Sequence, residues 1–311
     1  MKIGLDIMGG DFAPEAAVLG AILAHKALSG STLVLIGDKG IAVKILQENN
    51  FSPDNFEFVH TTEVIGMGEH PTKAIVQKAD SSISVGFKLL KEGAIQAFSS
   101  AGNTGAMLVG SMFSIKAISG VMRPAVTSIV PQVKGGVGVL LDVGANADCK
   151  PDMLVQFGML GTLLAQYVYK IENPRVALLN IGEEEEKGNI LTQATFPLLK
   201  AADNLNFVGN VESRHIFDDV ADVIVSDGFT GNVIIKLSES FYEIAHNKGI
   251  KDEFFERFNY EQYGGSPIVG VNGSVVVGHG ISTPEAIKNM VLLSKTVYES
   301  GVIEKITQAF Q

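Results

Sequence analysis

Residues 137–151 read VGVLLDVGANADCKP and carry the pattern that decides the fold. A strand-like run, Val137–Val143, leads into a polar elbow that begins at Asp142 and is rich in glycine and asparagine. A helical stretch, Pro151–Lys170, follows at once, and proline favours the first turn of a helix. These residues therefore predict a strand, an elbow and a helix in succession.

The same succession recurs along the chain. Most of its strand-like runs lack in–out alternation, as expected when helices cover both faces of a parallel sheet. Helical stretches separate the runs, among them Pro14–Leu28 and a last helix with Thr283 as N-cap and Pro284 as first residue. We predict an α/β fold over residues 1–311, a single domain with room for two lobes. The other strand-like runs are Ile3–Met8, Thr32–Gly37, Phe56–His60, Ile95–Ser99, Val176–Ile181, Asn206–Val208, Val223–Ser226 and Ser274–Val277.

Seven of the predicted strands end in elbows that combine glycine with Asn, Asp, Thr, Glu or His. The carboxyl ends of parallel strands share one edge of a sheet, where ligands bind, and the helix after each elbow points free N–H groups at that edge. We expect the elbows to gather around an anion, although glycine and asparagine also serve simply as turns and caps. The elbows are Gly9–Asp11, Ser100–Gly105, Asp142–Lys150, Asn180–Glu185, Val208–Glu212, Ser226–Asn232 and Gly278–Gly280.

Composition excludes several classes of protein. The chain has 24 Lys and Arg against 34 Asp and Glu, a net charge of −10, and no basic stripe, which argues against a nucleic-acid partner. A single cysteine, Cys149, excludes a disulfide framework, and we interpret it as a small buried side chain. Asp6 interrupts the early apolar run that a signal peptide needs, and the uncharged stretch Met153–Tyr169 is short for a membrane span. We expect a soluble, cytoplasmic protein.

Several standard signatures are missing. The three G-x-G triplets lack the third glycine of the dinucleotide fingerprint, and neither a phosphate-binding P-loop nor G-x-S-x-G occurs. There is no H-E-x-x-H, so we expect no zinc, while a carboxylate-bound Mg²⁺ stays open. The remaining donors, carboxylates and cations favour chemistry on phosphate or on a carbonyl without a covalent enzyme intermediate.

Eight segments of the sequence together resemble those of a known family. The chain resembles the phosphate acyltransferases of bacterial phospholipid synthesis, the PlsX family, in eight segments that follow the family's order over nearly the whole length. The segments are Asp6–Asp11, Ser100–Ala106, Met122–Ala125, Leu141–Pro151, Leu179–Glu184, Gly209–Glu212, Ser226–Asn232 and Tyr263–Pro267.

This resemblance implies transfer of a long-chain fatty acyl group from acyl-acyl carrier protein to inorganic phosphate, giving an acyl phosphate. It further implies a three-layer α/β/α fold like those of phosphotransacetylases and isocitrate dehydrogenases, a homodimer, and no metal or organic cofactor. The product feeds a membrane-bound acyltransferase, which implies contact with that enzyme or a peripheral position at the inner face of the membrane.

One segment departs from the family. Many members carry a longer helical hairpin with an apolar tip between Asn232 and Tyr263, used to touch the membrane and the partner subunit. Here residues 237–262 form only a short helical excursion, polar around 247–253, which puts membrane binding in doubt. The aromatic residues Phe254, Phe255 and Phe258 are spaced as on a helix, and we expect them to serve packing.

The donors and cations receive roles as hypotheses. Asn103 and Thr104 are expected to cradle phosphate or the carbonyl oxygen, with helix capping as the alternative. Asn146 and Lys150 would add a donor and a positive charge across the site, although Lys150 equally suits a surface ion pair. Arg123 is a candidate phosphate ligand, but an arginine before a proline also anchors turns.

The acidic and titrating groups are assigned in the same way. Asp142 and Asp227 are expected to accept hydrogen bonds from pantetheine or to orient a donor, with structural capping as the alternative. Asn232 is expected to open the helix after the Asp227 elbow. His279 is the candidate general acid toward the leaving thiolate, because histidine titrates near neutral pH; a structural histidine is the alternative.

Competing functions stay open. Acyl carrier proteins are acidic, so docking on this acidic chain requires a basic patch, either Lys248, Lys251 and Arg257 or Lys73 and Lys78. A phosphotransacetylase-like enzyme acting on acyl-CoA would show similar elbows. A metal-dependent hydroxyacid dehydrogenase of the same fold and a non-catalytic scaffold at the membrane are more distant alternatives.

Overall fold

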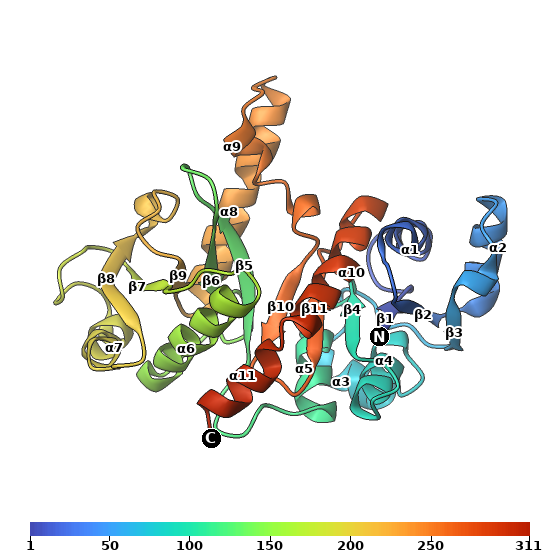
Figure 1. Cartoon of the computed structure of the whole chain (residues 1–311), viewed down its shortest axis with the longest axis horizontal. Helices are drawn as coiled ribbons and strands as arrows, with labels where there is room; N and C mark the ends of the chain where they lie inside the picture. Colours follow the sequence, from blue (N-terminus) through green and yellow to red (C-terminus); the bar gives the residue numbers. More distant parts are fainter. The chain divides into compact units, whose positions relative to one another are not determined.

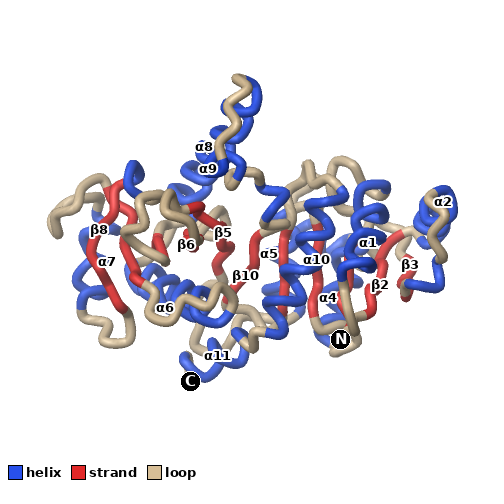
Figure 2. Tube along the Cα trace, turned by 45° about the horizontal axis from the view of Figure 1, so that its top comes forward, coloured by secondary structure: helices blue, strands red, loops and turns tan.

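The protein consists of two compact units. The computed structural model describes all residues, 1–311. Unit 1 comprises Met1–Ala117 and Tyr260–Glu299, and unit 2 comprises Ile118–Asn259 and Ser300–Gln311. Each unit is built on a mostly parallel sheet flanked by helices, which confirms the predicted α/β class (Figures 1 and 2).

Unit 1 has six strands in the order β3-β2-β1-β4-β11-β10. All neighbouring strands pair in parallel except β10 and β11. The inner strands are buried on both faces, because helices cover the sheet, and this explains their unbroken apolar runs. The strands are β1 (Lys2–Asp6), β2 (Thr32–Gly37), β3 (Glu57–His60), β4 (Ala97–Ser100), β10 (Ser266–Val269) and β11 (Ser274–Val277).

The helices of unit 1 surround a core that includes Ile3, Leu5 and Ile287. Helices α1 and α10, distant in sequence, pack together where Gly20 faces Ile287: a Cβ atom at Gly20 would lie 2.5 Å from the Ile287 Cβ. Thr283 Oγ1 accepts a hydrogen bond from Ala286 N at 3.4 Å, which confirms the predicted N-cap of the last long helix. The helices are α1 (Glu15–Ala27), α2 (Lys39–Glu48), α3 (Pro71–Gln77), α4 (Ser82–Lys91), α5 (Thr104–Ser114) and α10 (Pro284–Glu299).

Unit 2 has five strands in the order β5-β6-β9-β7-β8. Only β5 is antiparallel, to β6; β6, β9, β7 and β8 are parallel, so their carboxyl ends share one edge. The strands are β5 (Ala125–Pro131), β6 (Val137–Leu141), β7 (Arg175–Asn180), β8 (Asn206–Glu212) and β9 (Val223–Val225). The helices are α6 (Pro151–Tyr167), α7 (Ile190–Lys200), α8 (Gly228–Asn247), α9 (Glu253–Glu256) and α11 (Val302–Ala309).

The uncharged stretch that begins at Met153 forms most of α6. Leu154, Phe157, Leu160 and Leu164 on this helix are fully buried in the core of unit 2. None of the helices combines the length and the apolar character that crossing a membrane demands.

The segment 237–262 contains the carboxyl-terminal part of α8, a turn and the single turn of α9. In Figure 1 this part of α8 and α9 project from the sheet of unit 2. The Phe258 ring packs edge-to-face on Phe217 at 5.2 Å between centroids, and Phe254 lies 5.0 Å from Phe258. The expected packing role of this aromatic cluster is therefore confirmed for Phe254 and Phe258.

Two strands and one boundary were missed by the sequence prediction. The missed strands, β5 and β10, are the antiparallel ones, and each contains a proline, Pro131 or Pro267. The predicted elbow Val208–Glu212 is wrong, because β8 continues through Glu212. The pairing of β8 with β7 skips Val208 at a bulge, and Gly209 adopts φ +106°, so this glycine marks a bulge rather than a strand end.

We predict that Gly20→Ala lowers the free energy of unfolding by roughly 1–3 kcal/mol, because the new methyl group would overlap Ile287. Denaturant unfolding followed by circular dichroism measures the effect. Gly68→Ala is the matched control, because nothing lies within 4 Å of its added Cβ. Equal stability of the two variants would contradict the close packing of α1 on α10.

Candidate functional site

In unit 1, three predicted elbows meet at the carboxyl ends of β1, β4 and β11. A Cβ atom at Gly9 would lie 2.7 Å from the backbone N of Gly102. Asp11 N donates to Gly280 O at 2.7 Å, and Gly278 N donates to Ser100 O at 2.9 Å. Only glycine permits such an approach between Gly9 and Gly102, so the predicted gathering of elbows is confirmed within this unit.

A buried carboxylate holds this group of elbows together. Asp6, the last residue of β1, accepts hydrogen bonds from Ser100 Oγ at 2.6 Å and from Met8 N at 2.8 Å. Burial raises the pKa of the Asp6 carboxyl, and the hydrogen bonds from Ser100, Ser82 and the elbow backbone oppose that rise. Asp6 thus ties the elbow of β1 to the end of β4.

The Asn103 side chain is occupied by structural hydrogen bonds. Its Oδ1 caps α5 by accepting from Ala106 N at 2.9 Å, and its Nδ2 donates to the carbonyls of Gly66, Met67 and Glu69, each at 3.1 Å. The amide therefore fixes the loop 66–69. Thr104 is exposed at the first position of α5, where backbone N–H groups lack partners within the helix.

His279 lies in the elbow after β11 and is exposed. Its Nδ1 accepts from Ile281 N at 3.4 Å, and its ring packs on Tyr260 with 5.2 Å between centroids. Tyr260 in turn donates its hydroxyl to Ile281 O at 3.0 Å. These contacts orient the exposed imidazole.

In unit 2, Asp142 plays the part that Asp6 plays in unit 1. It directly follows β6, is fully buried, and accepts four hydrogen bonds, from Val126 N, Ala145 N, Asn146 N and Asn146 Nδ2, at 2.6–3.3 Å. Burial raises its pKa, while the same hydrogen bonds act in the opposite direction. The carboxylate folds the elbow that follows it into a closed turn.

Asn146 joins this elbow to the next ones. Its Nδ2 also donates to Pro124 O at 2.8 Å, and its carbonyl accepts from Gly228 N at 2.8 Å. A Cβ atom at Gly228 would lie 2.7 Å from Asn146 O, and one at Gly231 would lie only 2.1 Å from Asp142 O. The elbows of β6 and β9 are thus packed backbone to backbone.

Asp227 and Asn232 are placed by the start of α8. Asp227 is its N-cap and accepts from Thr230 N at 2.8 Å and from Thr230 Oγ1 at 2.9 Å. The prediction that Asn232 opens this helix is wrong, because α8 begins at Gly228 and Asn232 lies in its second turn. Asn232 nevertheless faces the β6 elbow: a Cβ at Gly144 would be 3.5 Å from its Oδ1.

Two cations flank the β6 elbow along the chain. Lys150 is the N-cap residue of α6, and Arg123 precedes Pro124, whose carbonyl binds Asn146. Both side chains are exposed, and neither forms an ion pair. They are free to meet an anion at this edge of unit 2.

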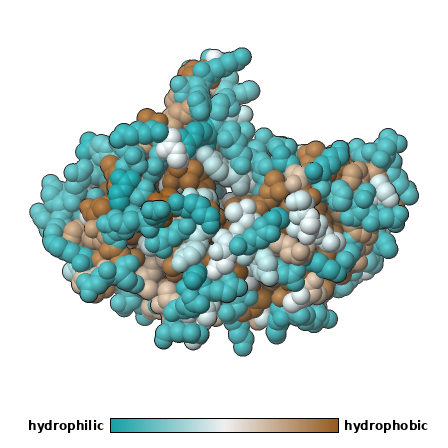
Figure 3. All heavy atoms as spheres, viewed as in Figure 1, coloured by the Kyte–Doolittle hydropathy of each residue, from teal (hydrophilic) through white to brown (hydrophobic).

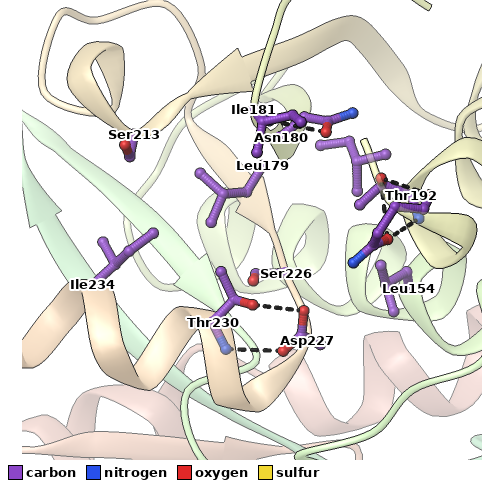
Figure 4. Close-up of a pocket in the computed structure, with 12 residues that line it drawn as sticks. Leu154, Leu179, Asn180, Ile181, Thr192, Ser213, Ser226, Asp227, Thr230 and Ile234 are labelled. Atoms are coloured by element: carbon purple, nitrogen blue, oxygen red, sulfur yellow. Dashed lines mark hydrogen bonds between the residues drawn. The ribbon is translucent and has the colours of Figure 1, made fainter. Parts of the chain in front are cut away.

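A cavity of about 220 Å³ opens at the same edge of unit 2 (Figure 4). It lies at the ends of β7 and β9, with Asn180 and Ser226 on its wall and Leu154 and Ile234 contributed by α6 and α8. The sequence prediction assigned no role to Ser226, Leu154 or Ile234. The only signal available was that Ser226 ends a predicted strand and begins a predicted elbow.

The chain contains no group of three or more His, Cys, Asp and Glu side chains arranged to hold a metal ion. The absence of a metal or cofactor from the reaction stays a prediction.

Comparison with known proteins decides the family. The sequence model of the family described as "Fatty acid synthesis protein" matches residues 1–305. The phosphate acyltransferase of Dictyoglomus turgidum is 40% identical over 99% of this chain and 97% of its own length. That of Clostridioides difficile is 41% identical over 99% of this chain and 96% of its own length. The chain belongs to the phosphate acyltransferase family.

Solved structures place this phosphate acyltransferase family member in a known fold group. A phosphotransacetylase from Streptococcus pyogenes superposes with a TM-score of 0.67 at 17% identity, covering 96% of this chain and 94% of that one. A 4-hydroxythreonine-4-phosphate dehydrogenase from Klebsiella pneumoniae gives 0.56 at 14% identity, covering 96% and 98% of the two chains. At these identities the likeness concerns the fold alone.

Cys149 is half-buried in the elbow that follows β6, near the carboxylates of Asp142 and Asp227. Its Sγ donates to Asn146 O at 3.5 Å. Burial, together with the negative charges of Asp142, Asp227 and Asp148, raises the pKa of the thiol to about 12. At neutral pH the sulfur is therefore protonated and a poor nucleophile, in line with the interpretation as a packing residue.

We predict that iodoacetamide alkylates Cys149 in the native protein at pH 8 on the order of 10³ times more slowly than in the unfolded chain, because alkylation follows the thiolate fraction. Mass spectrometry of timed samples measures both rates. Cys149→Ala is expected to keep full activity. Comparable rates in the folded and unfolded protein would show that the thiol is activated.

Proposed function

We propose that this protein transfers a long-chain fatty acyl group from acyl carrier protein to inorganic phosphate, forming an acyl phosphate for phospholipid synthesis. The near full-length identity of about 40% to phosphate acyltransferases carries the proposal. The polar elbows at the strand ends of each unit support it, since they supply donors and cations suited to anionic reactants.

In the proposed reaction, a phosphate oxygen attacks the carbonyl carbon of the thioester. A C–O bond forms, the C–S bond breaks, and its electron pair leaves with sulfur; the proton of hydrogen phosphate ends on the released thiol. A thiol with a pKa of about 8.5 is a fair leaving group, so acid assistance contributes modestly. The main demand is to stabilise two negative charges, on phosphate and on the tetrahedral oxygen.

From their hydrogen bonds and exposure, we assign the predicted residues either to contact with the reactants or to positioning. Lys150 and Arg123, exposed and unpaired, are proposed phosphate ligands, and Asn232 a donor beside the β6 elbow. Asp142 and Asp227 use their oxygens on their own elbows, so they act as positioning residues.

Three further residues receive roles by the same reasoning. Both amide hydrogens of Asn146 are used in hydrogen bonds to Pro124 O and Asp142. Its proposed role is therefore to hold the backbone of the elbow in place, and its side chain does not bind the reactants. In unit 1, Asn103 likewise positions the start of α5, and Thr104 keeps its exposed hydroxyl for a reactant. His279 is the proposed proton donor to the thiolate, and it regains its proton from the hydrogen phosphate that attacks.

The proposed donor, acyl carrier protein, requires positive charge at its docking surface. Arg257 donates its guanidinium to the carbonyls of Gln132 and Gly136, and Lys78 pairs with Glu69 at 2.5 Å. Lys248 and Lys251 are exposed and form no ion pair. We therefore place docking near the end of α8, with acyl-CoA as the alternative donor.

We further propose that the chain works as a homodimer in the cytoplasm, close to the membrane that receives its product. Helix α8 presents a stripe of exposed apolar side chains, Phe229, Val233, Leu237 and Ile244, at helical spacing. Figure 3 shows hydrophobic residues among hydrophilic ones on the projecting segment. A second copy covering this stripe would remove it from water.

We predict that the purified protein converts palmitoyl-acyl carrier protein and phosphate to palmitoyl phosphate in the presence of a chelator. Mass spectrometry of the products, with palmitoyl-CoA and acetyl-CoA in parallel reactions, identifies the donor. Preference for short acyl-CoA would favour the phosphotransacetylase-like alternative. Loss of turnover on chelation alone would contradict the metal-free mechanism.

We predict that Lys150→Gln raises the KM for phosphate roughly tenfold, about 1.4 kcal/mol, because a cation near the anion is lost. Lys170→Gln removes the same charge near the other end of α6, where the ammonium binds Tyr167 O, and is the matched control. Steady-state kinetics at varied phosphate measures both. An equal change in the two variants would remove Lys150 from the phosphate site.

A further inference from the structure

The cavity in unit 2 has a mainly apolar wall, although several polar residues border it. We call it the Ser226 cavity; it is bordered by Leu154, Leu178, Leu179, Ser226, Thr230 and Ile234. Its volume of about 220 Å³ is below the range of pockets that enclose a whole drug-sized ligand. It therefore suits one segment of a larger molecule.

Most polar side chains at the cavity are already satisfied by one another. Thr230 bonds to Asp227 through both its N–H and its hydroxyl. Asn180 accepts from Ile181 N at 2.9 Å and donates to Lys187 O at 3.1 Å. Thr192 is likewise bonded to the N-cap of α7. Because their polar groups are already hydrogen-bonded, these residues present mainly apolar atoms to a ligand.

Ser226 is the exception among the buried groups of the wall. Its exposed fraction is 3%, and its backbone is locked between Leu141 O and Asp142 N at 2.8 and 2.9 Å. Its Oγ takes part in none of the hydrogen bonds of the chain, yet it borders the cavity, and Figure 4 shows it among Leu179, Thr230 and Asp227. Because this hydroxyl opens into the cavity and has no partner within the chain, it is free to donate a hydrogen bond to a ligand atom there.

An apolar pocket with a single free hydroxyl fits a hydrocarbon segment that ends in one polar oxygen. We propose that the Ser226 cavity is the subsite for the first carbons of the acyl chain, and that Ser226 Oγ donates a hydrogen bond to the thioester carbonyl oxygen. The inference rests on the proposed acyl transfer to phosphate. As phosphate attacks, negative charge collects on that oxygen, so the hydrogen bond strengthens in the transition state.

The position in the fold supports this assignment. Ser226 follows β9 directly, and its backbone pairs with the Asp142 elbow, which Lys150 and Arg123 flank along the chain. A thioester with its chain in the cavity therefore has its carbonyl at the same strand edge as the proposed phosphate ligands. Ile234, half-buried on α8, forms the part of the wall that a larger side chain would fill.

The first variant tests the hydroxyl. Ser226→Ala is expected to lower kcat about 10²-fold with little change in KM, because the bond matters most in the transition state. Its stability should be unchanged, because the lost hydroxyl has no partner within the chain. Ser238→Ala is the control: this buried hydroxyl binds Ile234 O at 2.9 Å, and its loss should leave kcat intact. Full kcat in Ser226→Ala would overturn the proposal.

The second variant tests the chain subsite by filling it. Ile234→Phe is expected to weaken binding of palmitoyl-acyl carrier protein at least tenfold, measured at equilibrium without phosphate, and to leave acetyl-acyl carrier protein within about twofold. Ile41→Phe, the same change at an exposed position on α2, is the control. Equal weakening for both chain lengths, or for neither, would overturn the subsite.

The two levels of the proposal fail separately. Chain-length-dependent binding that Ile234→Phe abolishes, without any acyl phosphate from the wild-type protein, would support the subsite and reject the acyl transfer to phosphate. If the wild-type protein forms acyl phosphate and neither Ser226→Ala nor Ile234→Phe changes its rate, the acyl transfer would be supported and the subsite rejected.

Discussion

A buried carboxylate that accepts backbone N–H groups at the end of a strand is the interaction on which each unit depends. Asp142 takes up N–H groups of the residues that follow β6, and Asp6 does the same after β1. Neither carboxylate faces solvent, so each is retained at the cost of desolvation only because its hydrogen bonds are satisfied. The glycines at 9, 228 and 231 then let neighbouring elbows touch through their backbones.

This arrangement changes the meaning of the polar residues in the motifs. Asn103, Asn146 and Asp227 look like ligands in the sequence, yet their side chains hold the elbows themselves. In the proposed reaction, contact with the reactants passes instead to exposed groups, Lys150 and Arg123 among them, and to backbone N–H groups at helix starts. Such a scaffold suits a reaction without a covalent intermediate, because catalysis then rests on holding charges in place.

The charge of the chain adds a second constraint. With a net charge of −10, the protein repels an acidic partner and an anionic substrate at long range. Unpaired cations near the strand edge and at the end of α8 offset this repulsion locally. The hydroxyl of Ser226 complements them as a neutral donor that stabilises a developing oxyanion without adding charge.

Hydrophobic runs and glycine-rich elbows were enough to predict the α/β class, nine of the eleven strands and the helix after Pro151, because these depend on local pattern. The family was suggested by the resemblance of eight segments in a fixed order. The two antiparallel strands escaped, since Pro131 and Pro267 weaken a strand pattern that only tertiary pairing rescues. The bulge at Val208 and the role of each asparagine were decided by partners distant in the sequence. The Ser226 cavity belongs wholly to the tertiary structure, because its walls come from α6, β7, β9 and α8, and a free hydroxyl is defined only by the neighbours that fail to bind it.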